Sequence, residues 1–314
     1  MEENKNKKIM EILLMVSIST VLMILGIYYL PLITFLYPIP FVVLGVKYSN
    51  KLNIISMIVS VVVIGFFTDK FSGIFILLAF LPLSIALNYA IKERKKPIEI
   101  IAISTLVLMV SFFIILSITG DMTGISIVEQ LEEFFSEILN VQIELLKESG
   151  ISNHELFKFI DTMEDKFGEA LLIIPSIIMI LSLIMAYLNY LISVLILRRL
   201  GYGIVYTPKF SKFSLPNNIL LGTGIMLLGN FLLKVLKFPH YETIFINITT
   251  LISFVFFLQG LAVIDYRLIR KNRNWFLRVL AIIFISSILP LGGAITILGM
   301  LDIIFDFRKL KRPV

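Results

Sequence analysis

Residues 171–197, LLIIPSIIMILSLIMAYLNYLISVLIL, run for 27 positions without an acidic, basic or histidine side chain. An α-helix rises about 1.5 Å per residue, so about 20 apolar residues cross the ~30 Å hydrocarbon core of a bilayer. A helix on the surface of a soluble protein would instead have one apolar face and one polar face. This stretch therefore predicts a transmembrane helix, and it decides the fold class of the chain.

Similar apolar runs recur along the sequence. Hydrophobic residues make up 58% of the chain and charged residues 16%, against about 25% charged in a typical soluble domain. The candidate spans are residues 9–30, 32–46, 52–67, 73–91, 98–119, 171–197, 217–236 and 243–266, followed by a final apolar region at 277–307. We therefore predict an all-α, polytopic bundle of about 8 spans. We divide it into N-terminal membrane helices (1–119), an external acidic helical insertion (120–170) and C-terminal membrane helices with a basic tail (171–314).

The basic residues predict the orientation of these spans. With the N-terminus in the cytoplasm, alternating crossings place 22 of the 28 Lys and Arg residues on the cytoplasmic side and 6 on the other. Loops that stay in the cytoplasm carry an excess of Lys and Arg. We therefore predict a multi-pass protein of the cell membrane, embedded in the lipid bilayer, with both termini cytoplasmic.

The same argument applies to the final apolar region. Residue 267 and the basic residues after 307 both belong in the cytoplasm, so residues 277–307 must enter the membrane and return. The stretch Pro290-Leu291-Gly292-Gly293 is a natural turn, since Gly admits positive φ and Pro stops a helix. Each arm is too short to cross comfortably. We predict a re-entrant hairpin or two short helices, with one long kinked helix as the alternative.

The segment 120–170 differs from the rest of the chain. It holds 12 acidic residues against three Lys, and its apolar residues follow helical spacing. Ser152-Asn153-His154-Glu155 fits a capping box, in which a Ser and a Glu three residues later cap a helix start. We predict two amphipathic helices joined near Gly150, lying outside the membrane.

Ionisable groups near membrane segments are candidate functional sites, because burying a charge in hydrocarbon is costly. Asp265 ends the eighth span, and Asp302 and Asp306 lie one helical turn apart ahead of Arg308. These four residues form a predicted ionisable cluster at the membrane edge. The two carboxylates of the last helix would hold a cation or act as a salt-bridge latch with basic residues, and Asp265 would pair with Arg267 or another cytoplasmic cation.

Uncharged polar side chains within the spans offer a second kind of site. Asn88, Asn189, Asn230 and Gln259 are candidate contacts for a small-molecule ligand held between helices, and such amides also commonly hydrogen-bond one helix to another. Three glycines, Gly222, Gly224 and Gly229, would allow close helix contact.

A cytoplasmic loop combines basic and aromatic residues. Arg198, Arg199, Lys209 and Lys212 alternate with Tyr and Phe. This pattern fits contact with lipid headgroups, or docking of a cytoplasmic or membrane protein partner. Nucleic acid is not an expected partner, because topology already accounts for the positive charge.

Catalytic templates are absent from the sequence. The chain has no cysteine, which excludes disulfides, thiolate chemistry and Cys-based metal sites. It has no H-E-x-x-H pair, no phosphate-binding P-loop and no G-x-S-x-G. We expect no enzyme activity, no cofactor and no metal.

The order of features resembles the YybS-like family of bacterial multi-pass membrane proteins. Three stretches carry the likeness: residues 35–40 (FLYPIP), 259–263 (QGLAV) and 298–309 (LGMLDIIFDFRK). The resemblance covers nearly the whole chain and implies a membrane helix bundle, with no catalytic residues to carry over.

At the level of fold, the first five or six spans also look like the substrate-binding membrane subunits of energy-coupling-factor vitamin transporters. Those subunits commonly carry an alanine-x-x-x-alanine face on their first helix, where this chain has Ser17, Thr20 and Gly26. Two functions follow as hypotheses. The first is a transport-related protein that binds a small solute between helices. The second is a membrane scaffold or regulator that docks a cytoplasmic signalling or envelope enzyme through its basic loops.

Overall fold

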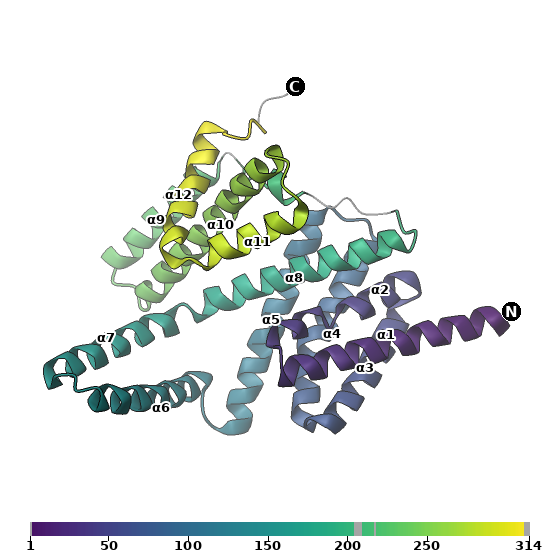
Figure 1. Cartoon of the computed structure of the whole chain (residues 1–314), viewed down its shortest axis with the longest axis horizontal. Coiled ribbons are helices and arrows are strands. Elements are labelled where there is room, and N and C mark those ends of the chain that lie inside the picture. Colours follow the sequence, from purple (N-terminus) through teal and green to yellow (C-terminus); the bar gives the residue numbers. More distant parts are fainter. Residues whose placement is uncertain (1, 204–208, 217, 311–314) are drawn as a thin grey trace. The chain divides into compact units, whose positions relative to one another are not determined.

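The structure is a computed structural model that describes residues 2–203, 209–216 and 218–310. These residues form helices joined by short connections, as predicted (Figure 1). The helices are α1 (Glu2–Tyr28), η1 (Pro31–Leu36), α2 (Ile39–Lys47), α3 (Asn50–Phe67), α4 (Lys70–Lys92), α5 (Pro97–Thr123), α6 (Ile127–Glu148), α7 (Asn153–Leu172), α8 (Ile174–Arg199), η2 (Phe210–Lys212), α9 (Ile219–Val235), α10 (Tyr241–Arg270), α11 (Trp275–Ser287) and α12 (Leu289–Phe305). Contacts divide the chain into two compact units. Unit 1 comprises residues 1–167 and 178–207, and unit 2 comprises residues 168–177 and 208–314.

Six helices within the described residues are long and apolar enough to cross a membrane. They are α3, α4, α5, α8, α10 and the part of α1 from Lys8 to Tyr28. The multi-pass helical architecture is therefore confirmed. The predicted spans at 32–46 and 217–236 correspond to shorter apolar helices, η1 with α2 and α9. A further pair, α11 and α12, is apolar enough to span but is bent by 114°.

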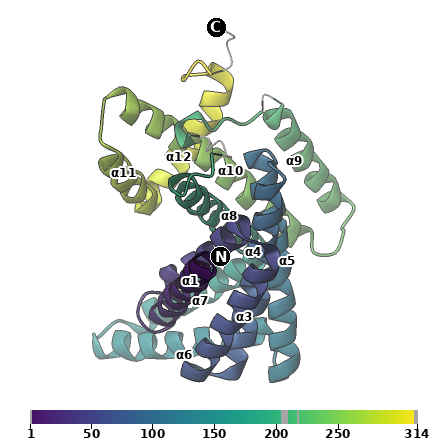
Figure 2. The ribbon, with the colours of Figure 1, turned by 90° about the vertical axis from the view of Figure 1, so that its right-hand side faces the viewer.

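The core of unit 1 forms around the short helix α2. Prolines 31, 38 and 40 break this segment into a 3-10 helix and an α-helix of nine residues. Tyr37 and Phe41 at its start are fully buried, and the Tyr37 ring packs against Phe80 of α4. Helix α4 contacts α2, α3 and α5, and the last two run alongside it (Figure 2). Because α2 is enclosed by other helices, it need not be long enough to span the bilayer.

The acidic segment forms the two predicted helices, α6 and α7. Ser152 and Glu155 make the predicted capping box: the Ser152 hydroxyl donates to Glu155 at 2.7 Å, and the Glu155 backbone N–H donates back to that hydroxyl at 3.4 Å. Ser126 and Glu129 form an equivalent box at the start of α6. The rings of Phe135 and Phe167 stack between the two helices, with centroids 4.0 Å apart.

Unit 2 is organised around α10, which contacts α9, η2, α11 and α12. The closest packing is between α10 and α12. A Cβ atom added at Gly260 would overlap the backbone of Ile295, and one added at Gly299 would overlap the backbone of Phe256. The three glycines of α9, which were predicted to allow close helix contact, make no such contact within the described residues. Apart from their chain neighbours and the backbone of α9 itself, no described atom lies within 4 Å of a Cβ built on any of them.

The final apolar region forms two short helices of 13 and 17 residues, one of the forms predicted for it. The turn, however, lies at Ile288 rather than at the Pro-Leu-Gly-Gly stretch, which begins α12 instead. Proline is well tolerated in the first turn of a helix, where its missing N–H would have had no helical partner.

Candidate functional site

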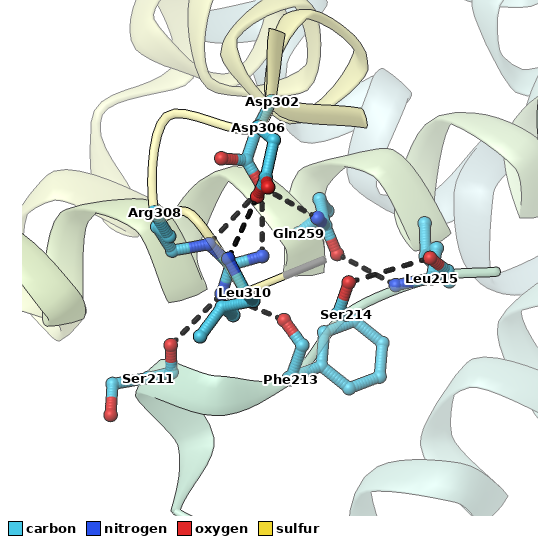
Figure 3. Close-up of polar contacts among 9 residues, drawn as sticks. All are labelled: Ser211, Phe213, Ser214, Leu215, Gln259, Asp302, Asp306, Arg308 and Leu310. Carbon is cyan, nitrogen blue, oxygen red and sulfur yellow. Dashed lines mark hydrogen bonds and ion pairs between the residues drawn. The ribbon is translucent and has the colours of Figure 1, made fainter. Parts of the chain in front are cut away.

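A buried polar cluster in unit 2 brings together three predicted site residues. Gln259 lies on α10, Asp302 on α12 and Arg308 in the tail that follows (Figure 3). We call these three residues the polar node. The Gln259 Nε2 donates to Asp302 Oδ2 at 2.7 Å, and Arg308 donates to the same oxygen from Nη2 at 2.8 Å and from Nε at 3.1 Å. All three side chains are at most 3% exposed.

The polar node also holds the chain segment that follows η2. Arg308 Nη1 donates to the backbone carbonyls of Ser211 at 2.9 Å and Phe213 at 2.7 Å. The Gln259 Oε1 accepts from the Leu215 backbone N–H at 3.1 Å. Residues 211–215 are therefore fixed to α10 and to the tail by side chains that meet in one buried cluster (Figure 3).

The end of α12 explains how Arg308 returns to Asp302. Asp306 adopts a left-handed conformation, with φ of 46°, and its backbone N–H donates to the Asp302 carbonyl. Its carboxylate accepts from the Leu310 N–H at 2.9 Å. Aspartate tolerates this backbone conformation better than most residues. Asp306 thus serves the turn, whereas Asp302 serves the ion pair.

The polar node holds chain segments together through hydrogen bonds and an ion pair. Arg308 uses four N–H···O contacts, and its positive charge is matched by Asp302. Asp302 Oδ1 is buried and has no hydrogen-bond partner among the described residues. A buried ion pair with its remaining groups mostly satisfied resists disruption strongly, because removing one partner leaves an isolated charge.

Asp265 forms an ion pair separate from the polar node. It is buried on α10 and pairs with Arg278 of α11, with Arg278 nitrogens 2.7 to 2.9 Å from its two oxygens. Within the predicted four-residue ionisable cluster, Asp302 and Arg308 thus pair with each other, Asp265 pairs with Arg278 outside the cluster, and Asp306 forms the turn. Both pairs lie within unit 2, and each joins α10 or α12 to a following segment.

The four amide candidates are divided between the two units. Asn88 and Asn189 belong to unit 1, and Asn230 and Gln259 to unit 2. Both ends of the Gln259 amide are used within the polar node. Asn189 Nδ2 donates to the carbonyls of Phe35 at 2.8 Å and Met185 at 2.9 Å. Asn230 is the buried residue of α9, and its Oδ1 has no partner among the described residues.

Asn88 stands out because neither of its amide atoms is hydrogen-bonded within the described part of the chain, although the side chain is fully buried. It lies on α4 one turn beyond Ser84, whose hydroxyl donates to Asn53 Oδ1 on α3 at 3.3 Å. The Nδ2 of Asn53 likewise has no described partner. Gly45 of α2 packs directly on the Asn88 amide, where any side chain would collide with it. We call Gly45, Asn53, Ser84 and Asn88 the amide junction.

The predicted docking residues lie in two places. Arg198 and Arg199 end α8 in unit 1, and both are exposed. Lys209 and Lys212 are exposed on either side of buried Ser211 in unit 2. Part of the predicted loop, residues 204–208, lies outside the described residues.

Sequence reasoning did not single out Gly45, Asn53 or Ser84. A glycine at the end of a short apolar helix gives no sign of which polar group will face it. The one available signal was the i, i+4 spacing of Ser84 and Asn88, which places two polar residues on one face of an apolar helix.

Comparison with known proteins agrees with this architecture. The family model described as "Predicted membrane protein (DUF2232)" matches residues 17–303. The chain is 26% identical over 311 residues to "Uncharacterized protein YybS" of Bacillus subtilis (strain 168), an alignment that covers 97% of this chain and 98% of that protein. No solved structure matches the chain. The predicted YybS-like resemblance is confirmed, and the chain belongs to the DUF2232 family of predicted membrane proteins.

Proposed function

We propose that this chain is a non-enzymatic, transport-related membrane protein whose unit 1 binds a small, uncharged polar solute at the amide junction. The observation that carries the proposal is the Asn88 side chain, fully buried with no hydrogen bond to either amide atom from the described residues. A buried polar group without a partner costs about 1–3 kcal/mol. A solute that satisfies the amide would recover this free energy.

The groups at the junction determine which solutes fit. Asn88 offers two N–H donors and a carbonyl acceptor, and Asn53 offers further donors from its unpartnered Nδ2. Asn53, Ser84 and Asn88 carry no charge, so they suit a neutral ligand with its own donors and acceptors rather than an ion. In the structure Asn88 is packed against Gly45, so entry of a solute requires α2 and α4 to separate locally.

The composition of unit 1 supports the same function. It holds the five N-terminal membrane segments together with most of α8. This set is similar in number to the spans of the energy-coupling-factor subunits that the sequence resembles at the level of fold. The sequence contains no P-loop, so ATP-driven uptake would take its energy from a partner subunit.

The test uses the full chain in lipid nanodiscs, with released small molecules identified by mass spectrometry. Asn88→Leu removes the unpaired amide, and we expect it to keep or raise the unfolding temperature while losing the bound solute. The matched control is Asn189→Leu, which removes an amide whose donors are already bonded to Phe35 and Met185. The control should lower the unfolding temperature and keep the solute. Equal solute release from wild type and Asn88→Leu, or none from wild type above empty nanodiscs, would refute the proposal.

A second candidate function is docking of a protein partner through unit 2. The polar node fixes residues 211–215, and this holds Lys212 exposed beside a rigid backbone. Preorganisation of this kind lowers the entropy cost of binding. A photo-crosslinking residue in place of Lys212 should capture a defined acidic protein in cells. The same residue at Lys96 of unit 1 is the control, and an identical set of captured proteins from both positions would count against docking at Lys212.

A further inference from the structure

A surface hollow at the end of α10 has no role in either proposed function. Its volume is about 500 Å³, and it is lined by Ile264, Arg267, Leu268, Arg270 and Lys271. We call it the basic hollow. Three of its five lining residues are cations, and the other two are branched aliphatic side chains.

The charges of the basic hollow are not neutralised by the protein that the structure describes. Arg267, Arg270 and Lys271 are exposed, and none of them forms an ion pair with a described carboxylate. Asp265, two residues before Arg267, is already held by Arg278. The hollow therefore presents three positive charges and hydrogen-bond donors that are available to an external anion.

The length of α10 places these residues at the level of lipid headgroups. The helix has 30 residues, which corresponds to about 45 Å, against a hydrocarbon core of ~30 Å. Its excess length must extend into the headgroup region, and cations near the ends of membrane helices are found there. Arg267, Arg270 and Lys271 lie in the final turn and immediately after it.

The order of side chains along α10 matches a phospholipid. Ile264 and Leu268 lie one turn apart and therefore share a face of the helix. Arg267 and Lys271 repeat the same spacing three positions nearer the helix end. The hollow thus begins with an apolar residue, Ile264, for acyl chains and ends with Arg270 and Lys271, which are donors for a phosphate group. Arginine binds phosphate in bidentate geometry.

We propose that the basic hollow binds the phosphate group of an anionic phospholipid. The chemistry recognised is a phosphate carrying net negative charge, with Ile264 and Leu268 contacting the upper part of its acyl chains. A zwitterionic phospholipid is a poorer ligand, since its ammonium group offsets the attraction. Free phosphate shares the recognised group but lacks the acyl chains, so it should bind more weakly.

The test is native mass spectrometry of the full chain in detergent with equal amounts of phosphatidylglycerol and phosphatidylcholine. Wild type should retain phosphatidylglycerol preferentially. The variant Arg267→Gln/Arg270→Gln/Lys271→Gln should retain at least fivefold less of it. The control Lys92→Gln/Lys95→Gln/Lys96→Gln removes the same charge from the end of α4 and the loop before α5 in unit 1, and it should behave as wild type. The single variant Arg270→Gln, at an exposed position, should show an intermediate loss if the triple variant fails to fold.

Two results would overturn the proposal. Equal loss of phosphatidylglycerol from both triple variants would mean that the lipid follows net charge rather than a site. Full displacement of phosphatidylglycerol from wild type by inorganic phosphate would mean that the hollow takes free phosphate and that the acyl contacts are irrelevant. The lipid site is supported if wild type keeps phosphatidylglycerol in the presence of inorganic phosphate and only the triple variant of the basic hollow loses it.

Discussion

Arg308 binds one carboxylate oxygen of Asp302 through two of its nitrogens, at 2.8 and 3.1 Å, although α12 ends between the two residues. The contact exists only because the chain reverses at Asp306. Since the same guanidinium also holds the carbonyls of Ser211 and Phe213, one buried arginine joins a helix, its own tail and a distant loop segment.

Breaking this ion pair on one side should destabilise unit 2 strongly. Arg308→Gln or Asp302→Asn leaves a buried charge without its partner, which costs about 3–5 kcal/mol. We expect either variant to lower the thermal unfolding midpoint in detergent by on the order of 10 °C. The double variant Asp302→Asn/Arg308→Gln should lower the unfolding midpoint by less than the sum of the two single decreases, because the residues are in direct contact.

Asp306→Asn is the control for this double-mutant cycle. Asparagine keeps the acceptor oxygen for the Leu310 N–H and tolerates the left-handed backbone. Asp306→Asn should lower the unfolding midpoint by less than Asp302→Asn does, because the turn and its hydrogen bond are kept. Strictly additive losses for Asp302→Asn and Arg308→Gln would mean that the pair does not act as one unit.

The close packing of α10 on α12 gives a second prediction. Gly260→Ala or Gly299→Ala would force a methyl group into the backbone of the facing helix, and overpacking a tight contact typically costs about 1–3 kcal/mol. Gly224→Ala on α9 is the matched control. It meets no described atom within 4 Å, and alanine is the better helix former by about 1 kcal/mol. Gly260→Ala or Gly299→Ala should lower the thermal unfolding midpoint, whereas Gly224→Ala should raise it. A similar decrease for Gly224→Ala would contradict the packing.

Helix caps and spans could be predicted because they depend on neighbouring residues in sequence. Ser152 and Glu155 are three positions apart, and the apolar runs are continuous, so both features can be read locally. The positions of the prolines likewise predicted the irregular segment before α2.

Partners that are distant in sequence could not be predicted. The spacing of Asp302 and Asp306 placed them on one helix face, but the helix ends at Phe305 and the two carboxylates take different roles. The partner of Asp265 is Arg278 rather than the nearer Arg267, because α11 brings Arg278 back to α10. The glycines of α9 predicted that another helix could approach it closely. Only the tertiary contacts reveal that the close approach is between α10 and α12, at Gly260 and Gly299.

The capping boxes of α6 and α7 predict a pH dependence outside the membrane segments. The Ser126 backbone N–H and hydroxyl lower the pKa of Glu129, and the Ser152 hydroxyl and backbone N–H lower the pKa of Glu155. A lowered pKa means that the caps stabilise the helices fully above the ordinary value of 4.5 and lose this effect as the pH falls through the lowered value.

Hydrogen exchange of the intact protein measures this effect. After correction for intrinsic rates, protection of the first turns of α6 and α7 should be constant from about pH 7 to pH 5 and fall below about pH 4.5. Glu155→Gln keeps a neutral capping side chain, so it should remove the pH dependence in α7 and leave that of α6. Persistence of the dependence in α7 of this variant would show that other groups cause it.

The sidedness of the acidic helices can be tested directly because the chain has no cysteine. Single cysteines at Glu137 on α6 and Lys96 before α5 both lie at exposed positions. A membrane-impermeant maleimide should label Glu137→Cys in intact cells and Lys96→Cys only after lysis, since the basic loops are expected in the cytoplasm. Labelling of both, or the reverse order, would contradict the predicted orientation.

The same reagent decides whether α11 and α12 return to the side from which they entered. Lys271 precedes the pair and Phe307 follows it, and both are exposed. Helices of 13 and 17 residues reach about 20 and 26 Å, each less than the ~30 Å core, so the bent pair should enter and return. Lys271→Cys and Phe307→Cys should then both require lysis for labelling, as Lys96→Cys does. Labelling of Phe307→Cys alone in intact cells would mean that the pair crosses the membrane as one broken span, and that the arginine of the polar node lies outside the cell.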